Sequence, residues 1–426
     1  MPYYHIWTIG CQMNKAESER LGSLLEKKGY RATAAPEKAD VIVLNSCVVR
    51  ESAENRVVNK LHLLKRLKKS HPEMTLAVTG CFVDSDEAAL RKAFPHVDYF
   101  FKAGDFPHWI EEIRGCDTLP QRPPVSVYVP IMQGCDNFCS YCIVPFRRGR
   151  ERSRPVEGLV AETRELVRRG AKEIILVGQN VDSYGHDLPD KPDLADLLQE
   201  LNGIEGLLRL RFLTNHPKDM SRKLIERVAS LDGVCEHMNL PVQAGDDATL
   251  QAMRRGYTVD HYRQLIADIR VRIPGVALST DVIVGFPSET DEQFHHTVDL
   301  LTDLRFDTVH VACYSPRAGT LAARQLEDDV PAADKSRRLR LVEQLQESIA
   351  TEINSRLMGT SVEVLVEGKT KGKWRGRTRS DKLVFFSAPF DVAQDRPGDY
   401  LGRLVDVRIE KTSPWSLQGR LEQSQG

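Results

Sequence analysis

The stretch that decides the fold is "QGCDNFCSYCIVPFRRGRERSR", residues 133–154, which holds three cysteines within eight positions. It follows an apolar run, 125–131, that predicts a β-strand, and loops after the strands of βα proteins usually carry the chemistry. Three thiolates can bind three irons of a cubane cluster and leave the fourth iron open. Cys135, Cys139 and Cys142 are therefore candidate cluster ligands, with the open iron available to a cofactor. A structural zinc site would need a fourth ligand, for which His186 and His216 stay open as alternatives.

Strand and helix patterns alternate on both sides of this stretch. Six apolar runs predict strands at 125–131, 173–177, 207–213, 237–242, 276–284 and 308–313, and helical patterns lie between them at 157–169, 194–201, 219–230, 259–271 and 291–304. Six repeated βα units predict a partial (βα)6 barrel. A flat doubly wound sheet is the alternative.

The first hundred residues carry a second set of thiols. Runs at 6–9, 41–44 and 75–79 predict three strands of a βαβ parallel sheet, with helices at 18–28 and 53–69, and each strand is followed by a cysteine: Cys11, Cys47 or Cys81. The intervals (47 − 11 = 36 and 81 − 47 = 34 residues) each fit one βαβ step. Because the carboxyl ends of parallel strands share one edge, these thiols should converge on a second three-thiolate site. The alternative is that each fills the core as a small apolar residue.

The rest of the chain predicts a three-domain α/β protein. Prolines in 115–126 indicate a linker, 333–358 predicts one long helix, and short β-rich runs at 362–366, 383–386 and 404–409 predict a small β-barrel. The expected domains are 1–117, 121–350 and 359–424. The absence of a secretory leader or an apolar run of membrane-spanning length predicts a cytoplasmic protein with reduced thiols.

Positive charge is local, since 59 Lys and Arg nearly balance 60 Asp and Glu. In "KTKGKWRGRTR", residues 369–379, basic residues recur at every second position, so in one strand they would share a face opposite Trp374. We expect these positions to bind RNA phosphates, although a solvated charged surface is the plain alternative. The candidate RNA-binding residues are Arg147, Arg148, Arg150, Arg152, Arg154, Lys371, Lys373, Arg375 and Arg377.

Glycines and polar residues at later strand ends are candidate cofactor-binding residues, with ordinary turn and barrel packing as the alternative. They are Gly178, Gln179, Asn180, Gln243, Thr280 and Asp281. Asp281 needs a polar partner because apolar residues follow it in "STDVIVG".

The chain resembles the radical S-adenosylmethionine methylthiotransferases over essentially its whole length. The N-terminal part is similar in "TIGCQMNKAES", "NSCVVRESAE" and "VTGC", and the central part in "GCDNFCSYCIVPFRRGRERSR", "LVGQNVDSYG", "HPKD", "NLPVQAGDDATLQAMRRGYT", "LSTDVIVGFPSET" and "YSPRAGTLAA". "GRERSR" and "GQNVDSYG" point to the branch that acts on tRNA, and the tail looks like the family's RNA-binding TRAM module.

The resemblance implies two 4Fe–4S clusters and two molecules of S-adenosylmethionine. The cluster on Cys135, Cys139 and Cys142 would cleave the cofactor to a radical, and the other cluster would carry the sulfur. The implied reaction places a methylthio group on C2 of N6-isopentenyladenosine next to the anticodon. The implied partners are a tRNA anticodon stem-loop and a reducing flavodoxin or ferredoxin, and the implied state is a monomer. The rivals are a methylthiotransferase for N6-threonylcarbamoyladenosine and a non-catalytic RNA-binding protein with structural metal sites.

Overall fold

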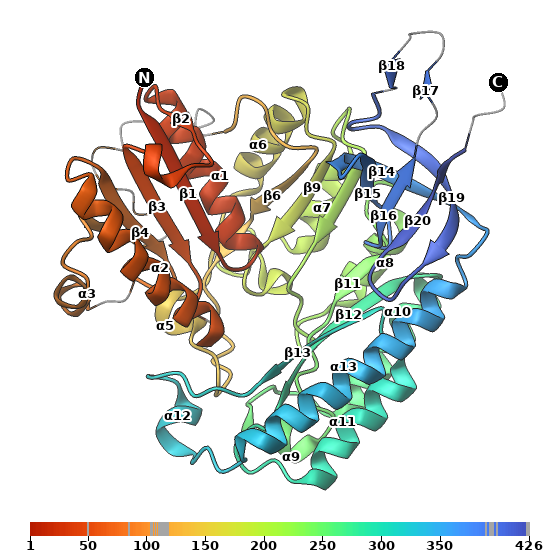
Figure 1. Ribbon diagram of the computed structural model, residues 1–426. Helices are drawn as coiled ribbons and strands as arrows, with labels where there is room; N and C mark the ends of the chain where they lie inside the picture. Colours follow the sequence, from red (N-terminus) through yellow and green to blue (C-terminus); the bar gives the residue numbers. More distant parts are fainter. Residues whose placement is uncertain are drawn as a thin grey trace.

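The computed structural model describes residues 1–48, 51–83, 86–102, 105, 107, 109, 119–387, 390–391, 396–397 and 399–422. Within these residues an N-terminal sheet and a C-terminal closed β-barrel flank a central array of strands and helices (Figure 1). The expected α/β class and its three-part order are confirmed.

The N-terminal part is a five-stranded parallel sheet in the order β2-β1-β3-β4-β5. Its elements are β1 Tyr3–Ile9, α1 Gln12–Lys27, β2 Arg31–Ala32, η1 Pro36–Lys38, β3 Val41–Ser46, α2 Glu51–Ser70, β4 Thr75–Gly80, α3 Glu87–Ala93 and β5 Tyr99–Phe100. Ile42 and Leu44 pack on the side of α2, whereas Val41 and Val43 pack on the side of α1. Strand β3 is therefore buried on both faces, as a continuous apolar run in a parallel sheet requires.

Six parallel strands form the central part. They are β6 Ser126–Pro130, β9 Glu173–Val177, β10 Arg209–Phe212, β11 His237–Asn239, β12 Ala277–Val284 and β13 Thr308–Cys313. β6, β9 and β10 pair in one run and β11, β12 and β13 in another, and a bridge between Leu210 and Val234 joins the two runs. The strands thus follow chain order in one curved array, which confirms the partial barrel.

Helices cover the outside of this array. They are α6 Val156–Arg168, η3 Val181–Ser183, α7 Leu194–Asn202, α8 Arg222–Ser230, α9 Asp247–Ala252, α10 Val259–Arg272, α11 Asp291–Leu304, α12 Leu321–Gln325 and α13 Ala332–Ser355; β7 Met132–Gln133, α5 Val144–Arg148 and β8 Arg152–Ser153 belong to the loop after β6. Strand β11 ends at Asn239, three residues earlier than predicted, because Pro241 has no N–H for the ladder.

The C-terminal part is a closed barrel of five strands in the order β14-β15-β16-β20-β19. The strands are β14 Ser361–Thr370, β15 Lys373–Arg377, β16 Leu383–Ser387, β19 Leu404–Thr412 and β20 Leu417–Leu421, with β17 Phe390–Asp391 and β18 Arg396–Pro397 as a separate pair. Val364, Val384, Phe386 and Val407 are fully buried in its core. Closure removes the exposed sheet edges that so short a module would otherwise leave open.

The expected domain limits remain predictions. The end of the first domain, at residue 117, and the first part of the expected linker, 115–118, lie outside the described residues. The limit at residue 350 falls inside α13, which continues to Ser355.

Two buried arginines on β10 attach the C-terminal barrel to the central array. Arg209 donates to the carbonyl oxygen of Arg377 (2.6 Å), and Arg211 donates to those of Thr378 (2.5 Å) and Arg379 (2.6 Å). Arg211 also pairs with the equally buried carboxylate of Glu173 at 2.6 Å. The module is therefore held through side chains of strand β10 itself rather than through the loops that follow the strands.

We predict that Arg211→Met destabilises the protein by about 3–5 kcal/mol, because it leaves the Glu173 carboxylate buried without its cation. Thermal unfolding followed by circular dichroism measures the change. The matched control is Arg222→Met, which breaks an exposed pair with Glu226 and should leave the unfolding temperature nearly unchanged. Equal effects of the two substitutions would contradict this account of the attachment.

Candidate active site

The first cysteine triplet lies at one edge of the N-terminal sheet. The Cys47 amide donates to the carbonyl of Ile9 (2.7 Å), and the Cys81 amide donates to that of Ser46 (2.7 Å). Cys11 caps the start of α1 directly after β1. The parallel ladder therefore brings together three thiols that lie more than thirty residues apart, as the spacing predicts.

Two glycines make room for this arrangement. A Cβ on Gly80, whose φ is +90°, would lie 2.4 Å from the Ser46 carbonyl oxygen, and one on Gly10 would lie 2.9 Å from the Cys47 Cβ. Asn14 is fully buried beside them; its side chain accepts from the Cys11 thiol (3.3 Å) and donates to Asn45 (2.8 Å). Larger residues at either glycine would push the strand ends, and with them the thiols, apart.

A buried arginine, Arg148, contacts the first triplet. The Nε of Arg148 lies 3.2 Å from the Cys81 sulfur, and its Nη1 pairs with Glu17 of α1 at 2.6 Å. A hydrogen bond from Cys47, followed by the charge of Arg148, lowers the pKa of the Cys81 thiol to about 6. Cys81 is thus held toward the thiolate form, which is the form that binds metal.

The second triplet is a single loop that several elements hold in place. Cys142 donates its amide to the Cys139 carbonyl (3.0 Å), and Cys135 donates to that of Gly149 (3.3 Å). Between them, Ser140 donates its amide to Met253 (3.0 Å) and its hydroxyl to Ala252 (2.7 Å) at the end of α9. The loop is therefore anchored to the distal strands of the barrel as well as to β6.

The electrostatic environment of the second triplet differs from that of the first. Burial raises the pKa of Cys135 to about 11 and that of Cys142 to about 12. The buried side chain of Arg255 donates to the Cys139 sulfur (3.4 Å), to Tyr257 and to the carbonyl of Pro241. Burial thus favours the neutral form of Cys135 and Cys142, and Arg255 is the positive group that contacts this triplet.

Within the described residues, no three His, Cys, Asp or Glu side chains are grouped so as to hold one metal ion. Each triplet instead consists of thiols close enough to affect one another's charge. The assignment of the six cysteines as cluster ligands stays a prediction.

Gln179 is the predicted cofactor residue that lies nearest the second triplet. Its Oε1 accepts from the amide of Gly134, the residue before Cys135, at 2.7 Å. The neighbouring Asn180 is buried, donates to Asp219 (2.8 Å) and keeps its Oδ1 without a partner. A Cβ on Gly178 would lie 2.7 Å from Met132, so packing alone requires that glycine.

The structure bears on two cofactor assignments on β12. Thr280 is fully buried and bonds to the Leu240 carbonyl (2.8 Å) and Tyr262 (3.3 Å), on the side of the covering helices, which argues against a cofactor contact. Asp281 points the other way and finds its expected polar partner in Asn239 (3.1 Å). Gln243 adopts a φ of +72° and extends the ladder of β12 with its main chain.

The basic loop after the second triplet divides into inner and outer residues. Arg148 is only 8% exposed and contacts Cys81, which argues against the expectation that it binds RNA. Arg154 is partly buried and bonds to Glu162 and to the Pro130 carbonyl (2.7 Å). Arg150 and Arg152 are exposed, and Arg150 pairs with Asp136 at 2.7 Å.

The basic series in the tail does not lie on one strand. Lys369 lies near the end of β14, which ends at Thr370, residues 371–372 form the turn, and β15 begins at Lys373, so the single-strand prediction is wrong. Lys369 consequently faces Trp374, with its Nζ 4.0 Å from the ring centroid. The alternation holds on β15 itself, where Lys373 and Arg375 are exposed and Trp374 is buried.

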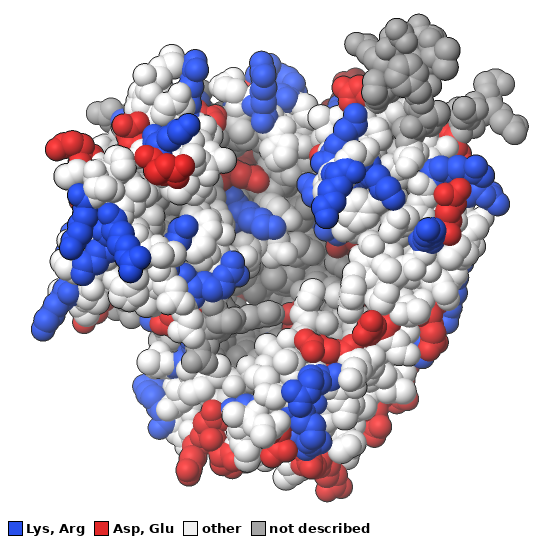
Figure 2. Space-filling model, in the orientation of Figure 1, with Lys and Arg blue, Asp and Glu red and all other residues white. Residues whose placement is uncertain are grey.

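Of the remaining predicted tail residues, Lys371 is exposed in the turn, and Arg377 pairs with Asp381 at 3.2 Å. Figure 2 shows basic side chains over the β14–β16 side of the barrel and over α2, on either side of a hollow in this face. The exposed cations of the tail are thus placed to reach a polyanion that enters the hollow.

A cavity of about 320 Å³ is lined by residues that directly follow one cysteine of each triplet. Its walls include Val48, which follows Cys47, and Ile143, which follows Cys142. The remaining lining residues are Glu54, Asn55, Arg147, Ser315, Pro316, Arg317 and Ala318. Arg317 pairs with Glu54 at 2.7 Å, so the loop after β13 and helix α2 meet at this cavity.

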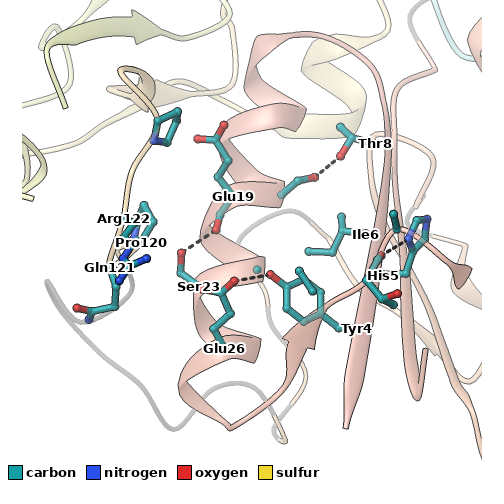
Figure 3. Close-up of a pocket in the computed structure, with 16 residues that line it drawn as sticks. Tyr4, His5, Ile6, Thr8, Glu19, Ser23, Glu26, Pro120, Gln121 and Arg122 are labelled. Carbon is teal, nitrogen blue, oxygen red and sulfur yellow. Dashed lines mark hydrogen bonds between the residues drawn. The ribbon is translucent and has the colours of Figure 1, made fainter. Parts of the chain in front are cut away.

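A larger cavity of about 720 Å³ lies elsewhere, between β1, α1 and the segment 120–124, and neither triplet lines it. Figure 3 shows Glu19, Ser23 and Glu26 of α1 on one side of it and Pro120 to Arg122 on the other. Tyr4 donates to Glu26 there at 3.0 Å. This cavity is the larger of the two, but the smaller one is the cavity that adjoins the cysteines and is therefore the candidate active site.

Arg148 and Arg255 contact cysteine sulfurs, a role that the sequence does not predict for either residue. Arg255 stands in "MRRGYT", a motif that belongs to the family resemblance, and Arg148 stands in the basic loop, for which RNA binding is expected. No local pattern distinguishes a buried arginine from an exposed one in a basic loop. The signal that could have found Arg148 is its place six residues after Cys142.

Comparisons with known proteins agree with this architecture. The Radical SAM superfamily matches residues 129–301, the Uncharacterized protein family UPF0004 matches 3–102, and the TRAM domain matches 356–421. A solved structure of the radical S-adenosylmethionine methyltransferase TsrM from Kitasatospora setae, with cobalamin and a [4Fe-4S] cluster bound, is 14% identical. It covers 88% of this chain and 81% of its own with a TM-score of 0.52, which shows a shared fold. The protein is a radical S-adenosylmethionine enzyme with an added RNA-binding module.

Curated relatives show to which family of radical S-adenosylmethionine enzymes the chain belongs. A protein of Dehalococcoides mccartyi named tRNA-2-methylthio-N(6)-dimethylallyladenosine synthase is 56% identical over 421 residues, 99% of each chain. Proteins of the same name from Chloroflexus aurantiacus and Moorella thermoacetica are 51% and 43% identical, covering 98% of this chain and 91% and 98% of their own. The chain belongs to the tRNA-2-methylthio-N(6)-dimethylallyladenosine synthase family.

Membership of the radical SAM superfamily implies a 4Fe–4S cluster and S-adenosylmethionine as cofactors. Three convergent thiols in one loop, one of them contacted by a buried arginine, are a donor set that suits such a cluster. Within the described residues, no helix is both long and apolar enough to cross a membrane.

Glu19 lines the larger cavity, and its carboxyl makes the stability of the protein depend on pH. Burial raises the pKa of this carboxyl to about 7, well above the value of an unfolded chain. Stability from this group is therefore complete below about pH 4.5 and is lost as the pH rises through 7. We predict that Glu19→Gln stabilises the protein at pH 8 by on the order of 1 kcal/mol, a value discounted because the side chain keeps some contact with water.

Urea unfolding of both proteins at pH 5 and pH 8 measures this difference. The gap should shrink toward zero at pH 5, where the wild-type carboxyl is already mostly protonated. A gap of the same size at both pH values would show that Glu19 contributes through packing rather than through its proton.

Proposed function

We propose that this protein is a tRNA methylthiotransferase that converts N6-isopentenyladenosine next to the anticodon into its 2-methylthio derivative. It would use two 4Fe–4S clusters and two molecules of S-adenosylmethionine. The printed name of its relatives specifies the same product, in which the isopentenyl group is called dimethylallyl. The observation that carries the proposal is the cavity of about 320 Å³, because its walls continue directly from a cysteine of each triplet.

The donor sets support both clusters. Cys135, Cys139 and Cys142 would hold one cluster and Cys11, Cys47 and Cys81 the other, and three ligands leave one iron of each free. A cluster with bound S-adenosylmethionine supplies the one-electron chemistry that activates a C–H bond.

The chain's own residues would prepare the base for that chemistry. Val48, Ile143 and Pro316 provide apolar surface against which a purine with an apolar N6 substituent can pack. The Arg317–Glu54 pair closes one side of the cavity and limits the access of water. Because an anticodon loop is single-stranded, its base can leave the stack at low cost and enter such a cavity.

Cations of the basic loop and the tail would hold the RNA backbone. We assign this role to Arg147, Arg150, Arg152, Arg154, Lys371, Lys373, Arg375 and Arg377, without Arg148. Gly178, Gln179, Asn180, Gln243 and Asp281, without Thr280, remain the proposed cofactor-binding residues. A flavodoxin or ferredoxin as electron donor, a monomeric state and a cytoplasmic location stay predictions.

Mass spectrometry of tRNA nucleosides tests the function. Purified protein reconstituted with iron and sulfide, given reductant, S-adenosylmethionine and isopentenylated tRNA, should form 2-methylthio-N6-isopentenyladenosine. Threonylcarbamoylated tRNA is the control substrate and should stay unchanged. Product from the control alone would favour the rival methylthiotransferase, and zinc in place of iron with no product would favour a non-catalytic RNA-binding protein.

Substitutions should separate the two triplets. Cys47→Ala should leave cleavage of S-adenosylmethionine to 5′-deoxyadenosine but reduce methylthio transfer by at least about 10³-fold, because only the first cluster loses a ligand. Cys139→Ala should abolish both reactions, and the buried Cys235→Ala is the matched control that should abolish neither. Methylthio transfer by the Cys47→Ala protein would overturn the sulfur-carrying role of the first triplet.

The salt dependence of RNA binding tests the tail. Lys373→Gln with Arg375→Gln should weaken binding of an anticodon stem-loop and lower the slope of log K against log salt by roughly 0.7–0.9 for each phosphate that the protein no longer neutralises. Replacing Lys92, in α3 of the N-terminal domain, by Gln serves as the control and should leave the slope unchanged. An unaltered slope in the double variant would exclude β15 from the RNA-binding surface.

A further inference from the structure

Each cysteine triplet has one buried arginine on one of its sulfurs, and the two arginines come from different elements. Arg148 of α5 reaches Cys81 at 3.2 Å, and Arg255, which follows α9, reaches Cys139 at 3.4 Å. The two arginines are 8% and 5% exposed. A buried guanidinium is costly to maintain unless a negative group compensates it.

The compensation differs between the two sites. Arg148 pairs with the Glu17 carboxylate at 2.6 Å. Arg255 forms no ion pair with a carboxylate in the described part of the chain; its neighbours are the Cys139 sulfur, two tyrosines and a carbonyl oxygen. The negative charge that Arg255 requires must therefore come from the thiolates.

A 4Fe–4S cluster on three thiolates meets that requirement. Three thiolates outweigh the two positive charges of the oxidised core, so the assembly is an anion, and reduction makes it more negative. Hydrogen bonds and positive charge at the ligand sulfurs favour the reduced form.

We propose that Arg148 and Arg255 are positioning residues that hold one ligand sulfur each and set the reduction potentials of the two clusters separately. The inference rests on the proposed function in requiring that both triplets bind clusters. Glu17 is the opposing group at the first site: it holds Arg148 in place and offsets part of its charge.

The sign of each effect follows from the charge removed. Arg255→Met takes a cation from the second site, so its cluster becomes harder to reduce. Arg148→Met does the same at the first site, whereas Glu17→Gln removes an anion there and makes reduction easier. The double variant Glu17→Gln, Arg148→Met removes a neutral pair and should lie closer to wild type than either single variant.

The experiment titrates one cluster at a time in the full-length chain. Replacing Cys135, Cys139 and Cys142 by Ala leaves the first site alone, and replacing Cys11, Cys47 and Cys81 leaves the second. Iron content and EPR-monitored redox titration are read in each background. We expect Arg255→Met and Arg148→Met each to change the reduced-to-oxidised ratio at fixed potential at least ten-fold at its own site, which is about 59 mV for one electron.

Arg222→Met is the control, because Arg222 is an exposed arginine on α8 that pairs with Glu226 and contacts neither triplet. It should leave both potentials unchanged. If Arg148→Met fails to fold, two other variants test the proposal. Arg148→Lys keeps the positive charge and should change the reduction potential of the first cluster little. Glu17→Gln must make that cluster easier to reduce. Unchanged potentials in the Arg255 and Glu17 variants would overturn the inference, whereas a parent protein that loads no cluster at one triplet would instead overturn the two-cluster part of the proposed function.

Discussion

The ion pair between Arg148 and Glu17, with the Cys81 sulfur on its other side, is the interaction on which the candidate site depends. Arg148 stands at the end of α5, six residues after the last cysteine of the second triplet, and its partners belong to the N-terminal sheet and its helix α1. One buried cation thus fixes a loop of the central barrel against the edge where the first three thiols converge. Moving these parts apart would break the ion pair and take the cation away from the Cys81 sulfur, so the pair specifies how the two parts are placed against each other.

Other contacts also join the N-terminal sheet and its helices to the central barrel. Met13 of α1 packs against Ile175 and Val177, on the face of β9 that points into the barrel. Arg317, after β13, reaches Glu54 on α2. The N-terminal sheet is therefore attached near both ends of the strand array, and Arg317 and Glu54 of that attachment line the smaller cavity. A site formed in this way keeps its two halves at a fixed separation, which is what chemistry on a single base by two separate centres would require.

Much of this could be predicted because it depends on periodicity. The helices and strands that place the thiols follow from alternating apolar runs, and the convergence of Cys11, Cys47 and Cys81 follows from the geometry of parallel strands. The errors lie where a side chain or a turn overrides the local pattern. The turn at Lys371 breaks the basic alternation, Pro241 shortens β11, and the direction of Thr280 depends on the pleat of β12 against α10. Arg148 could not be told from its exposed neighbours, because burial of a charged residue is decided by a partner 131 residues away.

The chain is nearly neutral overall, and part of its positive charge is buried rather than exposed on the surface. Arg148, Arg209, Arg211 and Arg255 are all buried, and they bind carboxylates, main-chain carbonyls or cysteine sulfurs rather than solvent. These cations bind the domains and the thiols together and are unavailable to a nucleic acid. The cations left for RNA are those of the basic loop, such as the exposed Arg150 and Arg152, and the exposed ones of the barrel beside the hollow in Figure 2. Because those charges are few and exposed, the backbone grip should be moderate and sensitive to salt, which suits an enzyme that must release its tRNA after each turnover.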